Sequence, residues 1–300
     1  MNYNSPKLNY IIMTSLVFIC AFEYILTKPL LDIVPVMTVI WLKYAVGFAV
    51  IVGVKIARGG PIQFALRDLP VFVLLALFGE VIYYFTGFSS MSYLPVALLT
   101  VMIAMAPVLS VIFDRFIYKR KVRAPAILGI CVSLFGISMV AGVDPEMLAG
   151  GRAVGYLLAI LPAISANMYN ILAIRVTKRY NTFDMAIYVI GATVAVSAPF
   201  GLGHLPPADA VDAAFVMTVI FLGVLVAAFG VFAYLNSLKT LGATTSLLFS
   251  NFVPVVACVF GWLLLGETIL PLQLIGGAIA LTGCAAVIWY KGRTEIFNKR

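Results

Sequence analysis

Ten apolar runs, separated by short clusters of charged residues, glycine and proline, divide this sequence from one end to the other. A helix that crosses the hydrocarbon core of a bilayer needs about 20 mostly apolar residues, so runs of this length are typical of membrane-spanning helices. The hydrophobic share of 63% and the charged share of 11% lie outside the range of soluble domains. The spans are expected near residues 9–27, 36–57, 69–89, 93–114, 125–142, 153–174, 184–202, 213–236, 242–265 and 271–290. We therefore predict an all-α integral membrane protein with ten transmembrane helices and the lipid bilayer as its solvent.

The basic residues favour one orientation of these spans, because positively charged loops are retained on the cytoplasmic side of a membrane. With the N-terminus inside, all but three of the 20 Lys and Arg residues fall in cytoplasmic segments. The exceptions are Lys28 and Arg152 in outer loops and Lys43 within a span. Both termini are therefore expected in the cytoplasm. This topology accounts for the net charge of +8 without a nucleic-acid partner.

The two halves of the chain align without a gap at a constant offset of 147 residues. Proline falls on proline, glycine on glycine and aromatic on aromatic at this offset: Pro107 and Pro254, Gly129 and Gly276, Gly136 and Gly283, Phe85 and Phe232, Phe113 and Phe260. The alignment predicts two five-helix domains, residues 1–146 and 147–300. Because five is odd, the second copy must enter the membrane from the opposite face, which gives a 5+5 inverted repeat. That architecture is typical of alternating-access transporters, although a repeat kept only for packing, as in some channels, stays open.

The fourth and fifth spans of the second half carry the most specific motif, PVVACVFGWLLLGETILPLQLIGGAIALTG, from Pro254 to Gly283. With its early proline, its Gly-Glu at the helix end and its spaced glycines, it resembles the EamA-type members of the drug/metabolite transporter superfamily. The sequence departs from that pattern at Arg120, which stands where the second half has Glu267, and at Ala21–Glu23, where a Trp-Gly pair is common. The resemblance implies an inner-membrane carrier, often an exporter, with a central cavity lined by the first four helices of each repeat. The fifth helix of each repeat would lie peripherally, and its glycines, Gly129 and Gly136 or Gly276, Gly277 and Gly283, would allow close backbone approach.

Three ionisable side chains fall within predicted spans, namely Glu23, Lys43 and Glu80. A charge inside a membrane is costly unless it is paired or faces water, so each one is a functional hypothesis. In one reading, Lys43 is neutralised by one carboxylate and the pair only holds two helices together. The second carboxylate would then be left to carry a proton or to meet a cationic group.

Neutral polar and aromatic side chains complete the predicted substrate-binding or proton-coupling set. The second half has Asn170, Ile190 and Ala227 at the positions equivalent to the three charges, so the charge is confined to the first half. The remaining members are Trp41, Tyr83 and Tyr84 as aromatic walls, and Asn167, Tyr169, Asn170, Tyr234 and Asn251 as polar groups. Pro107 and Pro254 are predicted to kink their helices and to free backbone carbonyls.

We predict a secondary-active exporter of small polar metabolites, amino-acid-like or amine-containing, with Glu23 or Glu80 as a proton-coupling group. Nucleotide-sugar-like anions are disfavoured because only Lys43 is a buried base, and a channel or facilitator stays open as an alternative. No GxxxxGK[ST] phosphate loop is present, which disfavours an ATP-driven pump. No enzyme, cofactor or metal site is expected, since the one histidine, His204, falls in an outer loop and the four cysteines lie in apolar runs. The chain could act as a monomer or a homodimer.

Overall fold

A computed structural model describes residues 6–59, 61–62, 66–117, 124–141, 152–177, 179–242, 246, 249–250, 252–266 and 271–297. Every regular element in this part of the chain is helical. The first half contains α1 (Pro6–Leu30), α2 (Val36–Arg58), η1 (Leu66–Asp68), α3 (Leu69–Ala76), η2 (Leu77–Val81), α4 (Ile82–Ser90), α5 (Val96–Ile103), α6 (Ala106–Ile117) and α7 (Ala124–Ala141). The second half contains α9 (Arg152–Thr177), α10 (Thr182–Gly201), η3 (Leu202–His204), η4 (Ala208–Ala210), α11 (Ala213–Phe221), η5 (Leu222–Gly230), α12 (Val231–Thr240), α14 (Val253–Leu265) and α15 (Pro271–Phe297).

Local sequence sets several helix boundaries. Asn181 and Asp212 precede α10 and α11, and their side chains accept hydrogen bonds from free backbone amides in the first turn, at 2.8 and 2.7 Å. Pro35 precedes α2, and its ring fixes φ at −59°, near the helical value. Proline also has no backbone N–H, so it leaves no unpaired amide at the start of the helix. Gly266 ends α14 with a φ of 63°, a left-handed conformation that a side chain would disfavour.

Seven described helical runs are long and apolar enough to cross a membrane. They overlap the four spans predicted between residues 9 and 114 and the three predicted between residues 153 and 236. Three shorter apolar helices, Ile127–Gly136, Val253–Leu265 and Leu274–Val287, fall within the remaining three predicted spans. Length and composition of the described helices thus confirm an all-helical membrane protein. They do not confirm ten spans, which stays a prediction, because only seven of the described helical runs meet both the length and the hydropathy of a membrane span.

The predicted kinks at Pro107 and Pro254 take a different form in the structure. Pro107 lies in the first turn of α6, after the helix is broken between Ile103 and Ala106. Pro254 likewise lies in the first turn of α14. A proline in the first turn removes an amide that has no intrahelical partner, so it costs little there. Both prolines begin a helical segment and do not bend a continuous one.

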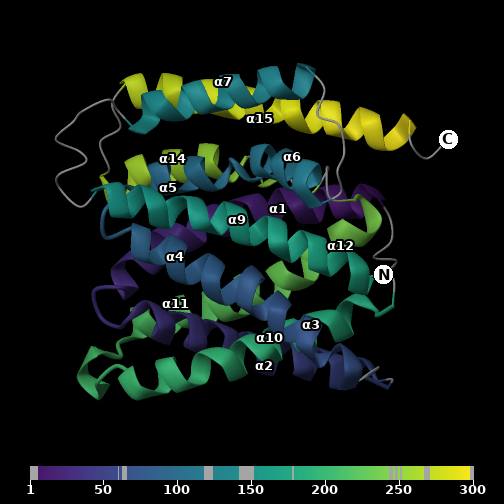
Figure 1. Cartoon of the computed structure of the whole chain (residues 1–300). Helices are drawn as coiled ribbons and strands as arrows, with labels where there is room; N and C mark the ends of the chain where they lie inside the picture. Colours follow the sequence, from purple (N-terminus) through teal and green to yellow (C-terminus); the bar gives the residue numbers. More distant parts are fainter. Residues whose placement is uncertain are drawn as a thin grey trace.

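The helices α7 and α15 form a layer of their own at one edge of the molecule (Figure 1). They pack closely because glycine removes the side chain at the contact, as small residues do between membrane helices. A Cβ atom at Gly136 would lie 2.5 Å from the carbonyl oxygen of Gly276, and one at Gly283 would lie 2.6 Å from that of Gly129. The predicted close approach of these glycines is confirmed.

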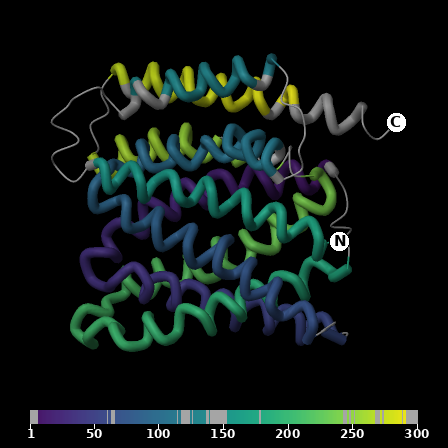
Figure 2. The backbone as a smooth tube through the Cα atoms, viewed as in Figure 1, coloured from purple at the N-terminus to yellow at the C-terminus, as the bar shows by residue number. Residues whose placement is uncertain are grey.

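Equivalent elements of the two halves make matching contacts. α1 packs on α14 as α9 packs on α5 and α6, and α2 packs on η5 as α10 packs on α3 and η2. The second helices themselves, α2 and α10, run antiparallel, since Lys55 at the end of α2 contacts Asp184 at the start of α10 while Thr38 contacts the opposite end. Figure 2 lets the reader follow both halves along the backbone. These two equivalent helices therefore run in opposite directions.

A π-helical segment interrupts the third helical run of each half, as η2 and η5. These wider turns lie at equivalent positions under the 147-residue offset. π-helical turns are uncommon and occur often at functional sites, because they displace side chains from the regular helical register. Ser165 of α9 donates a hydrogen bond of 2.5 Å to the carbonyl of Phe78 in η2, which satisfies a backbone group in the distorted turn. Glu80 lies in this segment.

Candidate functional site

A cavity of about 180 Å³ lies among the helices of both halves. Its wall is formed by α1, η2, α4, α5, α6, α9, η5, α12 and α14, together with Ala104 and Ser250. Most of the lining side chains are apolar, and the two ionisable carboxyls in the wall are Glu23 and Glu80. Five tyrosines also line it: Tyr24, Tyr83, Tyr84, Tyr169 and Tyr234.

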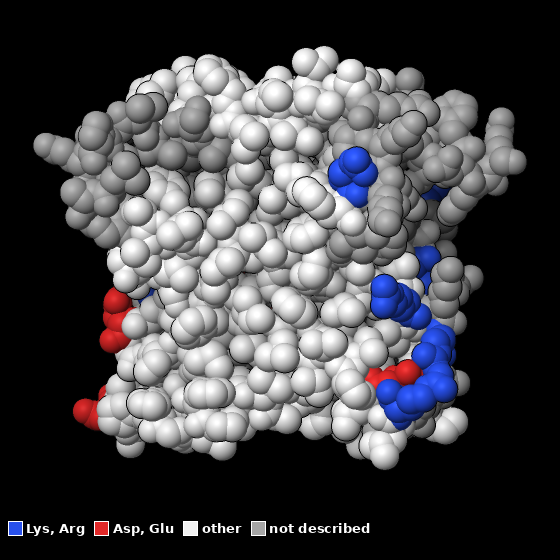
Figure 3. Space-filling model, viewed as in Figure 1, with Lys and Arg blue, Asp and Glu red and all other residues white. Residues whose placement is uncertain are grey.

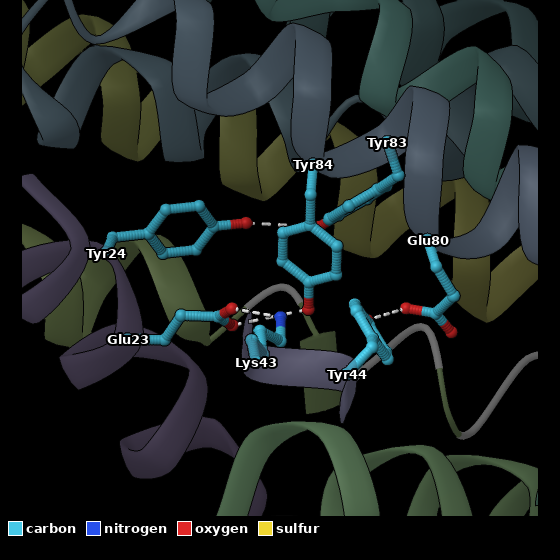
Figure 4. Close-up of polar contacts among 7 residues, drawn as sticks. All are labelled: Glu23, Tyr24, Lys43, Tyr44, Glu80, Tyr83 and Tyr84. Atoms are coloured by element: carbon cyan, nitrogen blue, oxygen red, sulfur yellow. Dashed lines mark hydrogen bonds and ion pairs between the residues drawn. The ribbon is translucent and has the colours of Figure 1, made fainter. Parts of the chain in front are cut away.

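Lys43 and Glu23 form a buried ion pair beside this cavity (Figure 4). The ammonium of Lys43 lies 2.5 Å from Oε1 of Glu23, and the lysine side chain is fully enclosed. The second oxygen of Glu23 accepts a hydrogen bond of 3.3 Å from the hydroxyl of Tyr84. The same ammonium lies 3.3 Å from the centroid of the Tyr84 ring and 4.9 Å from that of Tyr44, distances at which a cation is attracted to an aromatic face. Lys43 itself is not among the residues that line the cavity.

Glu80 lies on the other side of Tyr44 and has a different environment (Figure 4). The hydroxyl of Tyr44 donates a hydrogen bond to Oε2 of Glu80. No Lys or Arg among the described residues forms an ion pair with this carboxyl. Glu80 is 6% exposed, and it faces the cavity. The neighbouring Gly79 leaves room for the ring of Tyr169, because a Cβ there would lie 2.6 Å from the Cε2 atom of that ring.

The predicted polar residues of the second half are used in different ways. Tyr234 lines the cavity and donates a hydrogen bond of 3.0 Å to the side-chain oxygen of Asn170. The amide of Asn167 instead bonds the backbone carbonyls of Ala106 and Ala163, at 2.9 and 2.8 Å. These bonds tie α9 to the start of α6, so the amide nitrogen of Asn167 has a structural task.

The remaining predicted residues lie apart from the cavity or outside the described part of the chain. Trp41 is not among the lining residues, and its Cβ packs where a side chain on Gly201 would have to be. Asn251, Arg120 and Glu267 lie outside the described residues. The structure thus brings together Glu23, Glu80, Tyr83, Tyr84, Tyr169 and Tyr234 at the cavity wall, with Lys43 and Asn170 directly behind it.

Two regions of the chain match the model of the EamA-like transporter family, at residues 7–142 and 153–289. The chain belongs to this family. The two matched regions correspond to the two repeats, so this EamA-like transporter is built from a duplicated unit. A solved crystal structure, named only as a protein, superposes with a TM-score of 0.69 at 21% identity, covering 97% of this chain and 100% of that one. At that identity the likeness shows the fold alone.

Curated relatives of this EamA-like transporter carry transporter names. The chain is 25% identical to the uncharacterized transporter YdfC of Bacillus subtilis, over 77% of this chain and 76% of YdfC. It is also 25% identical to a probable terminal-alkyne amino-acid exporter of Streptantibioticus cattleyicolor, over 72% of each chain. An uncharacterized transporter of Archaeoglobus fulgidus is 22% identical, over 74% of this chain and 78% of its own length.

Sequence reasoning missed Tyr24 and Tyr44 of this EamA-like transporter. The hydroxyl of Tyr24 shares a hydrogen bond of 3.1 Å with that of Tyr83 across the cavity wall, and Tyr44 separates the two acidic groups. Each tyrosine directly follows one of the charged residues Glu23 and Lys43 in the sequence. That adjacency was the available signal, but neighbours along a helix point about 100° apart, so it does not identify which ring faces a charge.

The two ends of the α2 and α10 pair differ in chemistry. At one end Lys55 forms an ion pair of 2.9 Å with Asp184, which is fully buried. Nearby, Asp68 accepts hydrogen bonds from Arg179 at 3.0 Å and Tyr180 at 2.7 Å. At the other end, Thr38 donates to the carbonyls of Gly201 and His204 at 3.2 Å. One end is therefore closed by ion pairs and the other by neutral hydrogen bonds.

Proposed function

We propose that this EamA-like transporter is a secondary-active, alternating-access carrier that exports small amine-containing or amino-acid-like metabolites in exchange for protons. The observation that carries the proposal is the separation of the two buried acids. Glu23 is neutralised by Lys43, whereas Glu80 faces the cavity with a tyrosine hydroxyl as its one hydrogen-bond donor among the described residues. An ionised carboxyl without a counter-charge in an apolar site is unstable, so Glu80 would bind either a proton or a cationic substrate.

Competition between these two ligands would couple substrate to protons. A proton entering from one side would displace the cation from Glu80, and the cation would return only when the proton leaves. Glu23 cannot exchange its partner so readily, because both of its oxygens already accept hydrogen bonds. We therefore assign coupling to Glu80 and a structural role to the pair of Glu23 and Lys43.

The arrangement of the repeats supports alternating access through a ten-span, 5+5 inverted repeat with domains 1–146 and 147–300. The equivalent helices α2 and α10 run antiparallel, and equivalent elements of the two halves make matching contacts, so the two halves could exchange conformations about the central cavity. In this proposal the ionic end and the neutral end of the α2 and α10 pair are the two closures that open in turn.

Charge distribution supports an inner-membrane orientation with both termini in the cytoplasm. Figure 3 displays Lys and Arg side chains gathered toward the end of the molecule where Figure 1 places the N- and C-termini. Exposed basic residues at that end of the described helices are Lys7, Arg58, Arg67, Arg115, Arg175, Arg179 and Lys239. Exposed acids Asp32, Asp209 and Asp212 lie in the segments at the opposite ends of the helices. Retention of positive charge in the cytoplasm would fix this orientation.

Counterflow in proteoliposomes tests the proposal. Vesicles containing the purified protein are preloaded with one of a panel of amines and amino acids, and uptake of the same labelled compound is measured over a range of concentrations. We expect saturable exchange with at least one compound, and a proton gradient should drive accumulation in the wild type but not in Glu80→Gln. Uptake that rises linearly with concentration would indicate a channel. Proton-driven accumulation that survives Glu80→Gln would refute the coupling role.

A further inference from the structure

We propose that the cavity selects a small organic cation with an apolar body and no free carboxylate, so that an amine is preferred over the amino acid with the same side chain. This inference rests on the proposed carrier function and narrows its substrate class. The observation behind it is that Lys43, the one buried base among the described residues, does not line the cavity. Lys43 is 1% exposed, contributes nothing to the described lining and is held by Glu23 at 2.5 Å.

The charges around the cavity leave one negative charge without a partner. Glu23 and Lys43 cancel each other, and Glu80 has no ion-pair partner among the described residues. A bound monocation would bring the total to zero. A zwitterion would add no net charge, and it would carry its own carboxylate into a site that already contains Glu80.

The hydrogen-bond donors of the wall are largely committed to protein groups. The hydroxyl of Tyr84 donates to Glu23 and that of Tyr234 to Asn170. The hydroxyls of Thr100 and Ser250 donate to backbone carbonyls one turn back along the chain, at 3.0 and 3.2 Å.

Few donors therefore remain for a substrate carboxylate. Among the lining hydroxyls described, Tyr169 and one member of the Tyr24 and Tyr83 pair keep a hydrogen to donate. Two neutral donors do not replace the charged partner that a buried carboxylate requires.

The same wall is well suited to an ammonium group. Tyrosine oxygens accept hydrogen bonds from ammonium, and aromatic faces attract it. The site already holds one ammonium in this way, because Lys43 lies 3.3 Å from the centroid of Tyr84. The rings of Tyr83 and Tyr84 lie 4.9 Å apart at 76°, and those of Tyr169 and Tyr234 lie 6.2 Å apart, so ring edges and faces surround the space beside Glu80.

Shape and lining restrict the rest of the substrate. The cavity volume of about 180 Å³ lies below the range of roughly 300–1,000 Å³ typical of sites for drug-sized ligands. Apolar side chains such as Leu16, Val226 and Val253 line much of the remaining wall. A short aliphatic or single-ring body fits this description.

Matched pairs of compounds test the selectivity. Binding of 3-methylbutylamine is compared with binding of leucine, and 2-phenylethylamine with phenylalanine, because each pair differs only by the carboxylate. Equilibrium binding to the purified full-length protein is measured together with counterflow of each compound. We expect each amine to bind at least about tenfold more tightly than its amino acid, a difference of about 1.4 kcal/mol.

Variants connect that preference to Glu80. Glu80→Gln should abolish most of the amine preference, and Glu80→Asp should recover part of it because the negative charge returns. Asp209→Asn, which removes an exposed loop carboxylate, should leave the preference unchanged. Elution as a single species and an unchanged melting temperature exclude misfolding as the cause of a loss.

Two failures have different meanings. If the amino acids bind as tightly as the amines, or more tightly, while counterflow remains saturable, the cation preference is overturned and the carrier function stands. If no compound exchanges and none binds, both the proposed carrier function and the cation preference are refuted.

Discussion

In the first repeat of this EamA-like transporter, α1, α2 and η2 carry Glu23, Lys43 and Glu80, while α9, α10 and η5 carry Asn170, Ile190 and Ala227 at the equivalent positions. The contrast is sharpest where a side chain of each π-helical segment contacts α2. In the first repeat the carboxyl of Glu80 accepts a hydrogen bond from Tyr44 of α2. In the second, the methyl group of Ala227 packs so closely on α2 that a Cβ at Gly47 would lie 2.6 Å from it.

The comparison separates what the scaffold needs from what the site needs. Both repeats have a π-helical segment, a proline in the first turn of α6 or α14 and glycines at the α7 and α15 contact. Since the second repeat forms these features with Asn170, Ile190 and Ala227 at the three positions, the charges at Glu23, Lys43 and Glu80 are not required to build the unit. Buried charge is costly in a membrane, so we propose that the first repeat, which carries these three charges, is the one that recognises substrate or protons.

The largest effect is expected from breaking the ion pair of the first repeat. Lys43→Met leaves Glu23 buried without its counter-charge, and breaking such a pair costs about 3–5 kcal/mol of stability. The double variant Glu23→Gln with Lys43→Met removes both charges and should recover most of that loss. Thermal unfolding of the purified protein measures both. In the second repeat, Ile190→Met changes a fully buried apolar side chain of similar volume and should cost less than about 1.5 kcal/mol. A single variant as stable as the double one would contradict a structural role for the pair.

The next effect should appear in binding and not in stability. Glu80→Gln removes the one cavity carboxyl without an ion-pair partner among the described residues, and we expect amine binding to weaken roughly 10- to 100-fold, as for the loss of a hydrogen bond to a charged group. Asn170→Ala, at the position equivalent to Glu23, removes a neutral partner of Tyr234 and should weaken binding by less than about tenfold. Isothermal titration of the two variants checks the order. Equal losses would mean that the two repeats contribute alike to recognition.

Where the repeats are alike, matched variants should behave alike. Gly136→Ala and Gly283→Ala each place a methyl group against the backbone of the partner helix, and overpacking of this kind costs about 1–3 kcal/mol. Gly277→Ala is the control on the same helix α15, because a Cβ there would lie 3.8 Å from a methyl group of Val101, an ordinary van der Waals distance. Melting temperatures of the three purified variants measure these losses of stability. A large loss for only one of the first two would show that the interface is not symmetric.

The smallest effect concerns the two ends of the α2 and α10 pair. Arg179→Gln weakens a half-exposed ion pair at one end, and Thr38→Val removes neutral hydrogen bonds at the other, each at a cost of about 1 kcal/mol or less. Cys20 is a free cysteine that lines the cavity. Once Cys131, Cys258 and Cys284 are replaced, the rate at which a thiol reagent labels Cys20 measures access to the cavity from each side of the membrane. We expect Arg179→Gln to speed its labelling from the side that carries the termini, and Thr38→Val from the opposite side, by up to about fivefold. Faster labelling from the same side in both variants would argue against two alternating closures.

Much of the architecture was predictable from sequence because a bilayer imposes strong rules on composition and length. The expected spans overlap the described helices, and the paired glycines of the last span in each half lie at a close helix contact as predicted. The three buried charges were recognised from their position inside apolar runs, and Glu23, Lys43 and Glu80 are all buried in the structure. Periodicity could not show that Asn167 would bond backbone carbonyls or that Trp41 would lie away from the cavity, since a side chain's direction depends on the rotation of its helix.

The sequence by itself determined that this chain belongs in a membrane, that it is duplicated, and that Glu23, Lys43 and Glu80 have no charged equivalents in the second copy, because apolar length, repeat offset and residue type can all be read along the chain. Only the tertiary structure decided that Lys43 pairs with Glu23 and not with Glu80, and that Tyr44 stands between them. The physical reason is that the sequence allows either carboxyl to be the ion-pair partner of Lys43. The choice depends on how α1, α2 and η2 are rotated against one another, and packing across the whole bundle sets that rotation.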